Sequence, residues 1–76
     1  MMLDIEEVRI LVGDMIEIAP ERIDISDDRD DVPGWDSLAH LRVVTALEKR
    51  FNIRLTMDQI VRTRTVEQLS RIVDGM

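Results

Sequence analysis

The helical spacing of the apolar residues limits this chain to an all-α fold more strongly than any other feature of its sequence. Apolar side chains recur every three or four residues in three separate stretches, as on one face of a helix. The run 52–55 alternates like a strand, but no second run could pair with it as a hairpin. We therefore expect a four-helix bundle of three longer helices and one short third helix, over about residues 5–18, 37–51, 57–62 and 66–74.

Capping residues support these helix boundaries. Pro20 is expected to end the first helix, because the residue before a proline avoids the α region. Gly75 follows the last helix, where glycine is common. Three pairs have the spacing of a capping box, in which two side chains accept backbone N–H groups at a helix start: Asp4 with Glu7, Thr56 with Gln59, and Thr65 with Gln68.

The second predicted helix separates its residues onto two faces. One arc is expected to face the core: Leu41, Val43, Val44, Leu47 and Phe51. The opposite arc carries Leu38, Arg42, Thr45 and Lys49, so Leu38 is an apolar side chain expected in solvent. The predicted core draws on all four helices: Val8, Leu11, Met15, Val44, Leu47, Phe51, Ile60, Leu69 and Ile72.

The length and composition of the chain exclude several classes of protein. Seventy-six residues allow one domain, residues 1–76, with a modest core. Residues 1–36 hold 12 acidic and three basic residues, so binding to nucleic acid, which needs clustered Lys and Arg, is not expected. There is no cysteine for disulfides or thiolate metal sites, and no apolar run approaches the roughly 20 residues of a membrane span. The N-terminus lacks the pattern of a signal peptide, so we expect a cytoplasmic monomer that does not bind membranes.

The acidic segment 21–36 is predicted to be a long loop between the first two helices. Ile23 and Ile25 alternate with charges and could pin this loop to the core. An EF-hand calcium loop is excluded, because its pattern would require acids where Arg29 and Pro33 stand. No metal site is therefore expected, and the crowded aspartates should form a solvated loop without regular structure: Asp27, Asp28, Asp30 and Asp31. A loop of this length in a compact domain is often functional.

The segment Gly34-Trp35-Asp36-Ser37-Leu38 joins this loop to the second helix. A serine at a helix start has an ordinary explanation as the N-cap, and Asp36 could equally be the cap. The wider context favours another role. The long loop, the exposed Leu38, and the pattern Leu41, Val44, Leu47, Glu48, Phe51 together resemble acyl carrier proteins, a resemblance that covers nearly the whole chain.

This resemblance implies that Ser37, flanked by Asp36 and Leu38, carries a covalent phosphopantetheine arm derived from coenzyme A. The chain would then be no enzyme but a carrier that holds acyl, polyketide or aminoacyl intermediates as thioesters. Its partners would be a phosphopantetheinyl transferase, a loading ligase, and downstream synthase or transferase enzymes. The helix N-terminus offers free N–H groups and positive potential near the incoming phosphate. The transferase would supply the base and the metal.

One departure from the family concerns the pathway. Carriers of fatty acid biosynthesis usually line the exposed face of this helix with carboxylates. In this chain the region is occupied by Ala39, Arg42, Lys49 and Arg50, and Glu48 alone retains the negative charge that is usual in the family. This favours a dedicated carrier, for instance in polyketide, nonribosomal peptide or aminoacyl pathways. We expect partners to contact Trp35, Leu38, Arg42, Thr45 and Lys49, with loop packing as the alternative role of Trp35.

Two other functions compete with the carrier. An unmodified helical protein–protein interaction module could use Trp35 and Leu38 to bind a protein. A small enzyme is disfavoured, because the chain has one histidine, no cysteine and no clustered acid–base pair. A lone histidine on a helix, such as His40, is more often a packing or hydrogen-bonding residue than a base.

Overall fold

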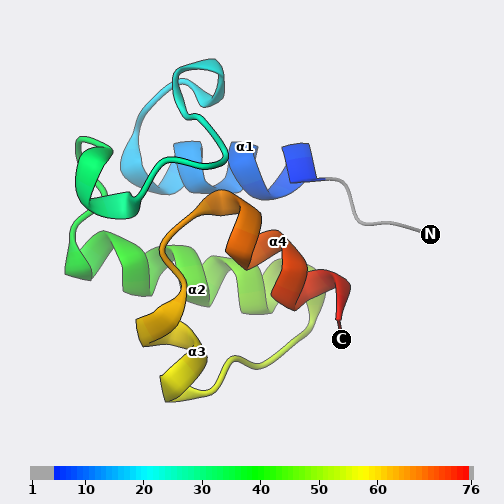
Figure 1. The fold of residues 1–76 in the computed structure, drawn as a ribbon. Coiled ribbons are helices and arrows are strands. Elements are labelled where there is room, and N and C mark those ends of the chain that lie inside the picture. The colour runs from blue at the N-terminus through cyan, green and yellow to red at the C-terminus, as the bar shows by residue number, and fades with distance from the viewer. Residues whose placement is uncertain (1–4, 76) are drawn as a thin grey trace.

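The computed structural model describes residues 5–75 and confirms the all-α fold. Its helices are α1 (Ile5–Ile16), α2 (Ser37–Phe51), α3 (Met57–Arg62) and α4 (Val66–Asp74), and the α1–α2 loop contains two 3₁₀ turns, η1 (Pro20–Arg22) and η2 (Arg29–Asp31). α1 packs against both α2 and α4, while the short α3 lies at the side of this group (Figure 1). No helix within the described residues is long and apolar enough to cross a membrane.

The first helix ends earlier than predicted, at Ile16 and without the help of Pro20. Glu17 takes a left-handed φ of 61°, and the amide of Ile18 donates to the carbonyl of Gly13 at 3.0 Å. This is the 6→1 bond of a Schellman turn. A Cβ on Gly13 would lie 2.6 Å from the Ile18 oxygen, so the turn depends on glycine at this place. Pro20 instead begins η1, and the predicted cap Asp4 lies outside the described residues.

The caps of the last two helices follow the prediction except at one bond. Thr56 and Gln59 form the complete capping box of α3. Thr65 accepts from the amide of Gln68 at the start of α4, but the Gln68 side chain accepts from the amide of Arg64, not of Thr65. The predicted second capping box is therefore only half formed. Gly75 caps the end of α4 as expected.

The core is wider than the sequence predicted, because the loop contributes to it. Val8, Val44, Leu47 and Leu69 are buried as expected, whereas Leu11, Met15, Phe51, Ile60 and Ile72 are only half-buried. The placement of Leu41 in the core was wrong, since its side chain is 50% exposed. Buried residues outside the predicted core set come from the helices and from the loop: Val12, Ile16, Val32, Trp35, Ala39, Leu55, Val66 and Val73. The expected pinning of the loop holds, with Ile23 buried and Ile25 packed against the core.

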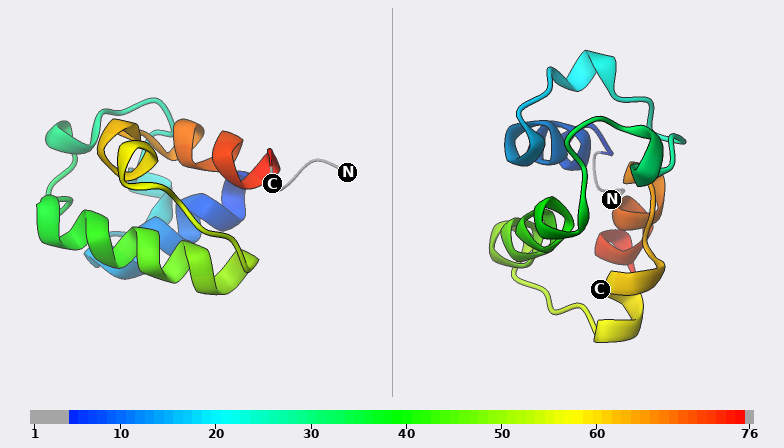
Figure 2. Two further views of the ribbon diagram at one scale, coloured as in Figure 1. Left: turned by 90° about the horizontal axis from the view of Figure 1, so that it is seen from below. Right: turned by 90° about the vertical axis from the view of Figure 1, so that its left-hand side faces the viewer.

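The loop crosses from the end of α1 towards the start of α4 before it returns to α2 (Figure 2). Two backbone bonds fasten it on the α4 side: the amide of Arg29 donates to the carbonyl of Arg64 at 2.7 Å, and the amide of Glu67 donates to the carbonyl of Ile25 at 3.1 Å. The segment before α2 is thus held by contacts with residues about 40 positions later. These contacts position the start of α2, where the candidate site lies.

Candidate functional site

Asp36, and not Ser37, caps the start of α2. The Asp36 carboxylate accepts from the amide of Ala39 at 2.8 Å, and its backbone is extended, as expected of an N-cap. Ser37 is therefore the first residue of the helix. Its side chain is exposed, and its hydroxyl makes no hydrogen bond with any of residues 5–75. The hydroxyl is consequently available to a second molecule.

The other two serines are engaged or buried. The hydroxyl of Ser26 donates to the carboxylate of Asp24 at 2.8 Å, and this contact and the Ser26 amide lower the pKa of Asp24. Ser70 is buried in α4. Of the three serines, Ser37 is the one that is exposed and whose hydroxyl forms no hydrogen bond with residues 5–75.

A tight turn lies directly before Asp36. The amide of Trp35 donates to the carbonyl of Val32 at 3.1 Å, and Gly34 within this turn has a φ of +86°. That backbone conformation favours glycine. The turn also lies against the end of α1, because a Cβ on Gly34 would come within 3.2 Å of the Ile16 carbonyl oxygen. This turn immediately precedes the cap and the start of α2.

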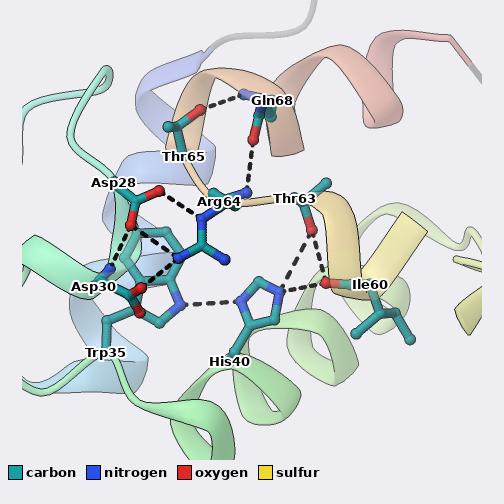
Figure 3. A network of polar contacts seen from close by, with 9 residues as sticks. All are labelled: Asp28, Asp30, Trp35, His40, Ile60, Thr63, Arg64, Thr65 and Gln68. Atoms are coloured by element: carbon teal, nitrogen blue, oxygen red, sulfur yellow. Dashed lines mark hydrogen bonds and ion pairs between the residues drawn. The ribbon is translucent and has the colours of Figure 1, made fainter. Parts of the chain in front are cut away.

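Trp35 is a core residue and not an exposed partner contact. Its side chain is 3% exposed, and its indole Nε1–H donates to Nδ1 of His40 at 3.1 Å (Figure 3). The prediction that Trp35 contacts partners is therefore corrected to the alternative of loop packing. The indole anchors the turn to the first turns of α2. A buried indole with a partner for its N–H is the usual arrangement for tryptophan.

His40 serves as a buried hydrogen-bonding residue. Its Nε2 lies 2.8 Å from the carbonyl oxygen of Ile60 in α3. Burial of the ring lowers the pKa of His40, the bond to the Ile60 carbonyl opposes this effect, and the nearby cations Arg29 and Arg64 add to it. Within residues 5–75, no hydrogen bond or ion pair joins the ring to a carboxylate or to Ser37. The packing role expected for a lone helical histidine is confirmed.

The acidic loop is ordered by a cation that the sequence did not point to. Arg64, between α3 and α4, donates to both oxygens of Asp28 at 2.6 and 3.0 Å and to Asp30 at 2.5 Å (Figure 3). The side chain of Asp28 also accepts from the amide of Asp30, and these bonds, with Arg64 first, lower the pKa of Asp28 to about 2. Part of the loop is thus structured as η2, which corrects the expectation of an irregular solvated segment. No cluster of possible metal ligands occurs among the described residues.

The exposed face of α2 beside Ser37 is apolar and basic. Leu38 is 61% exposed, as predicted, and Arg42, Thr45 and Lys49 are exposed on the same helix. Neither Arg42 nor Lys49 forms an ion pair within residues 5–75. A shallow groove of about 390 Å³ separates this face from α1, lined by Met15, Leu41, Arg42, Thr45, Ala46 and Lys49. The structure therefore brings four of the five predicted partner residues to one face and leaves Trp35 out.

The geometry at the start of α2 suits attachment of a phosphate-linked group. The Ser37 hydroxyl is accessible, and the helix N-terminus favours a phosphodiester's negative charge. A search of curated proteins gave no match. The family model described as "Phosphopantetheine attachment site" matches residues 6–73. Proteins of that family are non-catalytic carriers with a covalent 4′-phosphopantetheine group. The chain belongs to the family of phosphopantetheine-binding carrier proteins.

Proposed function

We propose that Ser37 is the residue that carries phosphopantetheine and that the chain presents thioester-bound intermediates to successive enzymes. The observation that supports this most concerns two adjacent residues. Asp36 caps α2, so Ser37 is exposed and its hydroxyl forms no hydrogen bond with residues 5–75. The hydroxyl oxygen would attack the pantetheine-side phosphorus of the coenzyme A pyrophosphate on a transferase, whose base takes the hydroxyl proton. The pyrophosphate P–O bond would break, and adenosine 3′,5′-bisphosphate would leave. The arm's thiol would then hold cargo at a high effective concentration near each active site.

The contribution of this chain to attachment is position and electrostatics. Ser37 lies on the first turn of a 15-residue helix, where backbone N–H groups not bonded within the helix favour an anion. Leu38 next to it offers an exposed apolar contact to a partner enzyme. Among residues 5–75, no base is hydrogen-bonded to the Ser37 hydroxyl, which is consistent with activation by a separate transferase.

The test is attachment measured by intact mass. Wild type, Ser37→Ala and the control Ser26→Ala are each incubated with a broad-specificity phosphopantetheinyl transferase and coenzyme A. We expect wild type and Ser26→Ala to gain one phosphopantetheine and Ser37→Ala to gain none. Circular dichroism should show that Ser37→Ala remains folded, because the cap of α2 is Asp36 and stays intact. A mass gain in Ser37→Ala would refute the assignment, and no gain in wild type would favour an unmodified interaction module.

The cargo that we propose is an acyl, polyketide or aminoacyl group of a dedicated pathway. The exposed cations Arg42 and Lys49 give the α2 face a sign opposite to the carboxylates that the resemblance leads one to expect for general fatty acid carriers. Partner enzymes should therefore carry acidic or neutral patches where they meet this face, since complementary charge governs encounter rate and rejection of wrong partners. Loading of the modified protein by candidate acyl and aminoacyl ligases, followed by mass, identifies the cargo class.

A further inference from the structure

Three hollows follow one another along the exposed side of α2. The lining of the first includes the two residues that flank Ser37 in the chain, and this hollow shares Met15 and Arg42 with the groove beside α1. That groove shares Thr45 and Lys49 with a third hollow of about 420 Å³. The third hollow is lined by Thr45, Glu48, Lys49, Asn52, Ile53 and Arg54. The hollows thus form one path from the start of α2 to the end that leads into α3 (Figure 1).

The chemical character of the lining changes along this path. Three apolar side chains line the middle groove: Met15, Leu41 and Ala46. The third hollow has two cations, Lys49 and Arg54, and neither forms an ion pair within residues 5–75. The acid in its lining is Glu48, whose carboxylate already accepts from the amide of Leu55 at 2.9 Å. An anion at the end of the path would therefore meet two cations whose charge no ion pair compensates.

The length of the phosphopantetheine arm matches the length of this path. About 14 bonds separate the serine oxygen from the sulfur of the arm, which at the reach of an extended peptide chain corresponds to roughly 16 Å. The rise along α2 is roughly 12 Å from Ser37 to Thr45 and roughly 18 Å from Ser37 to Lys49. An arm that lies along the groove therefore brings its thioester close to Thr45 and Lys49, and the cargo beyond the thioester reaches the third hollow.

We propose that the arm lies back along α2 and that its cargo is an acyl group with a carboxylate at the free end, bound by Lys49 and Arg54. This inference rests on the proposed attachment at Ser37. The methyl and methylene groups of the arm would cover the apolar side chains of the groove, and the carboxylate would meet the two cations. An exposed ion pair contributes little by itself. Covalent attachment, however, holds the carboxylate at a high effective concentration, so that a weak contact is populated.

The test compares two cargoes that differ only at the free end. A broad-specificity phosphopantetheinyl transferase attaches the loaded arm from adipoyl-coenzyme A, whose acyl group ends in a carboxylate, or from hexanoyl-coenzyme A, whose acyl group of equal length ends in a methyl group. Intact mass confirms a single attachment. Nuclear magnetic resonance at neutral pH then measures the amide shifts of residues 45–54 against those of the protein with the unloaded arm. We expect the adipoyl group to populate the third hollow roughly two- to fivefold more than the hexanoyl group, the factor that an exposed ion pair supplies.

Nuclear Overhauser contacts locate the cargo directly. The methylene protons of the adipoyl group should contact the methyl groups of Thr45 and Ile53, which line the third hollow. Contacts of the cargo with α3 in their place would overturn the inference.

Two double variants test the role of the cations. Lys49→Gln combined with Arg54→Gln should reduce the adipoyl response to that of the hexanoyl group. Arg22→Gln combined with Arg71→Gln removes the same charge from η1 and α4 and should leave the difference between the cargoes unchanged. Equal responses to the two cargoes in wild type, or an adipoyl response that persists in the first variant, would overturn the inference while the attachment stands. Absence of any mass gain in wild type would refute the attachment itself, and the inference with it.

Discussion

The leucines of α2 differ in what each contributes, according to where its side chain lies. Leu47 is fully buried among residues of α1 and α4, whereas Leu41, six residues earlier, is half exposed at the groove beside α1. Leu38 is more exposed still and lies next to Ser37. Buried apolar area stabilises the fold, while exposed apolar area is available to other molecules.

Leu47→Ala is expected to lower the free energy of unfolding by about 2–5 kcal/mol, the range for a large-to-small change in a packed core. In a domain this small, such a loss is a large fraction of the total stability. Leu41→Ala on the same helix is the control and should cost much less, since half of that side chain is already in water. Urea denaturation followed by circular dichroism measures both. Equal losses in the two variants would show that the buried face of α2 is misassigned.

At the scale of the elements, the loop is held both by its buried apolar side chains and by polar contacts to distant residues. Arg64 binds Asp28 and Asp30, and the backbone of Arg29 bonds to that of Arg64. The like charges of the loop are thus partly compensated, while no ion pair of Asp27 or Asp31 occurs within residues 5–75. Along the chain, α2 and α3 lie between the loop and Arg64, so this contact is a long-range one.

Arg64→Gln is expected to lower the melting temperature and to increase its dependence on salt. Without the guanidinium, the aspartates of the loop repel one another, and salt screens that repulsion, with a Debye length of about 8 Å at 0.15 M. Wild type should respond weakly to the change from low salt to 0.15 M, and Arg64→Gln should gain more. Arg62→Gln is the control, because within residues 5–75 Arg62 pairs with Asp58 of α3 alone and is mostly exposed. If the melting temperature of Arg64→Gln depended on salt as weakly as that of wild type, groups other than Arg64 would neutralise the loop.

The same ion pair predicts the response to acid. Arg64 lowers the pKa of Asp28 to about 2 from an ordinary 3.8, so its contribution is present above about pH 4 and is lost as the pH falls towards 2. Thermal melts of wild type and Arg64→Gln should therefore converge in that range.

At the scale of the whole molecule, charge is divided between two regions. The acidic residues concentrate in 1–36, and the exposed face of α2 carries the cations Arg42 and Lys49 beside the groove and Leu38. A partner that approaches Ser37 over α2 meets positive charge, whereas one that approaches over the loop meets negative charge. The electrostatic field of the protein thus attracts acidic partners over α2 and basic partners over the loop.

Arg42→Glu combined with Lys49→Glu is expected to slow loading by the native ligase and to alter its dependence on salt, with the fold intact. Arg22→Glu combined with Arg71→Glu makes the same change in net charge on η1 and α4 and serves as the control. Loading rates are measured by mass at low and at physiological salt. An equal decrease in both variants would point to net charge alone, and unchanged loading in the first would place the docking surface elsewhere.

The sequence alone determined the features that rest on contacts within about four residues. The helical spacing predicted α2, α3 and α4 within their observed bounds, because periodicity and caps such as Thr56 are local. The exposure of Leu38 and the place of Ser37 at a helix start followed from the same pattern. The resemblance to acyl carrier proteins predicted membership of the carrier family, which the family model over residues 6–73 confirms.

Only the tertiary structure decided the features that depend on residues far apart in the chain. Trp35 is buried because it meets His40, and His40 reaches the carbonyl of Ile60. Arg64 orders Asp28 from 36 residues away, and no local pattern marks such a pair. The exposure of Leu41 likewise depends on where α1 lies, which the apolar arc of α2 does not specify. Sequence spacing gives the face of an element, whereas the neighbour that covers this face is set by how the elements pack together.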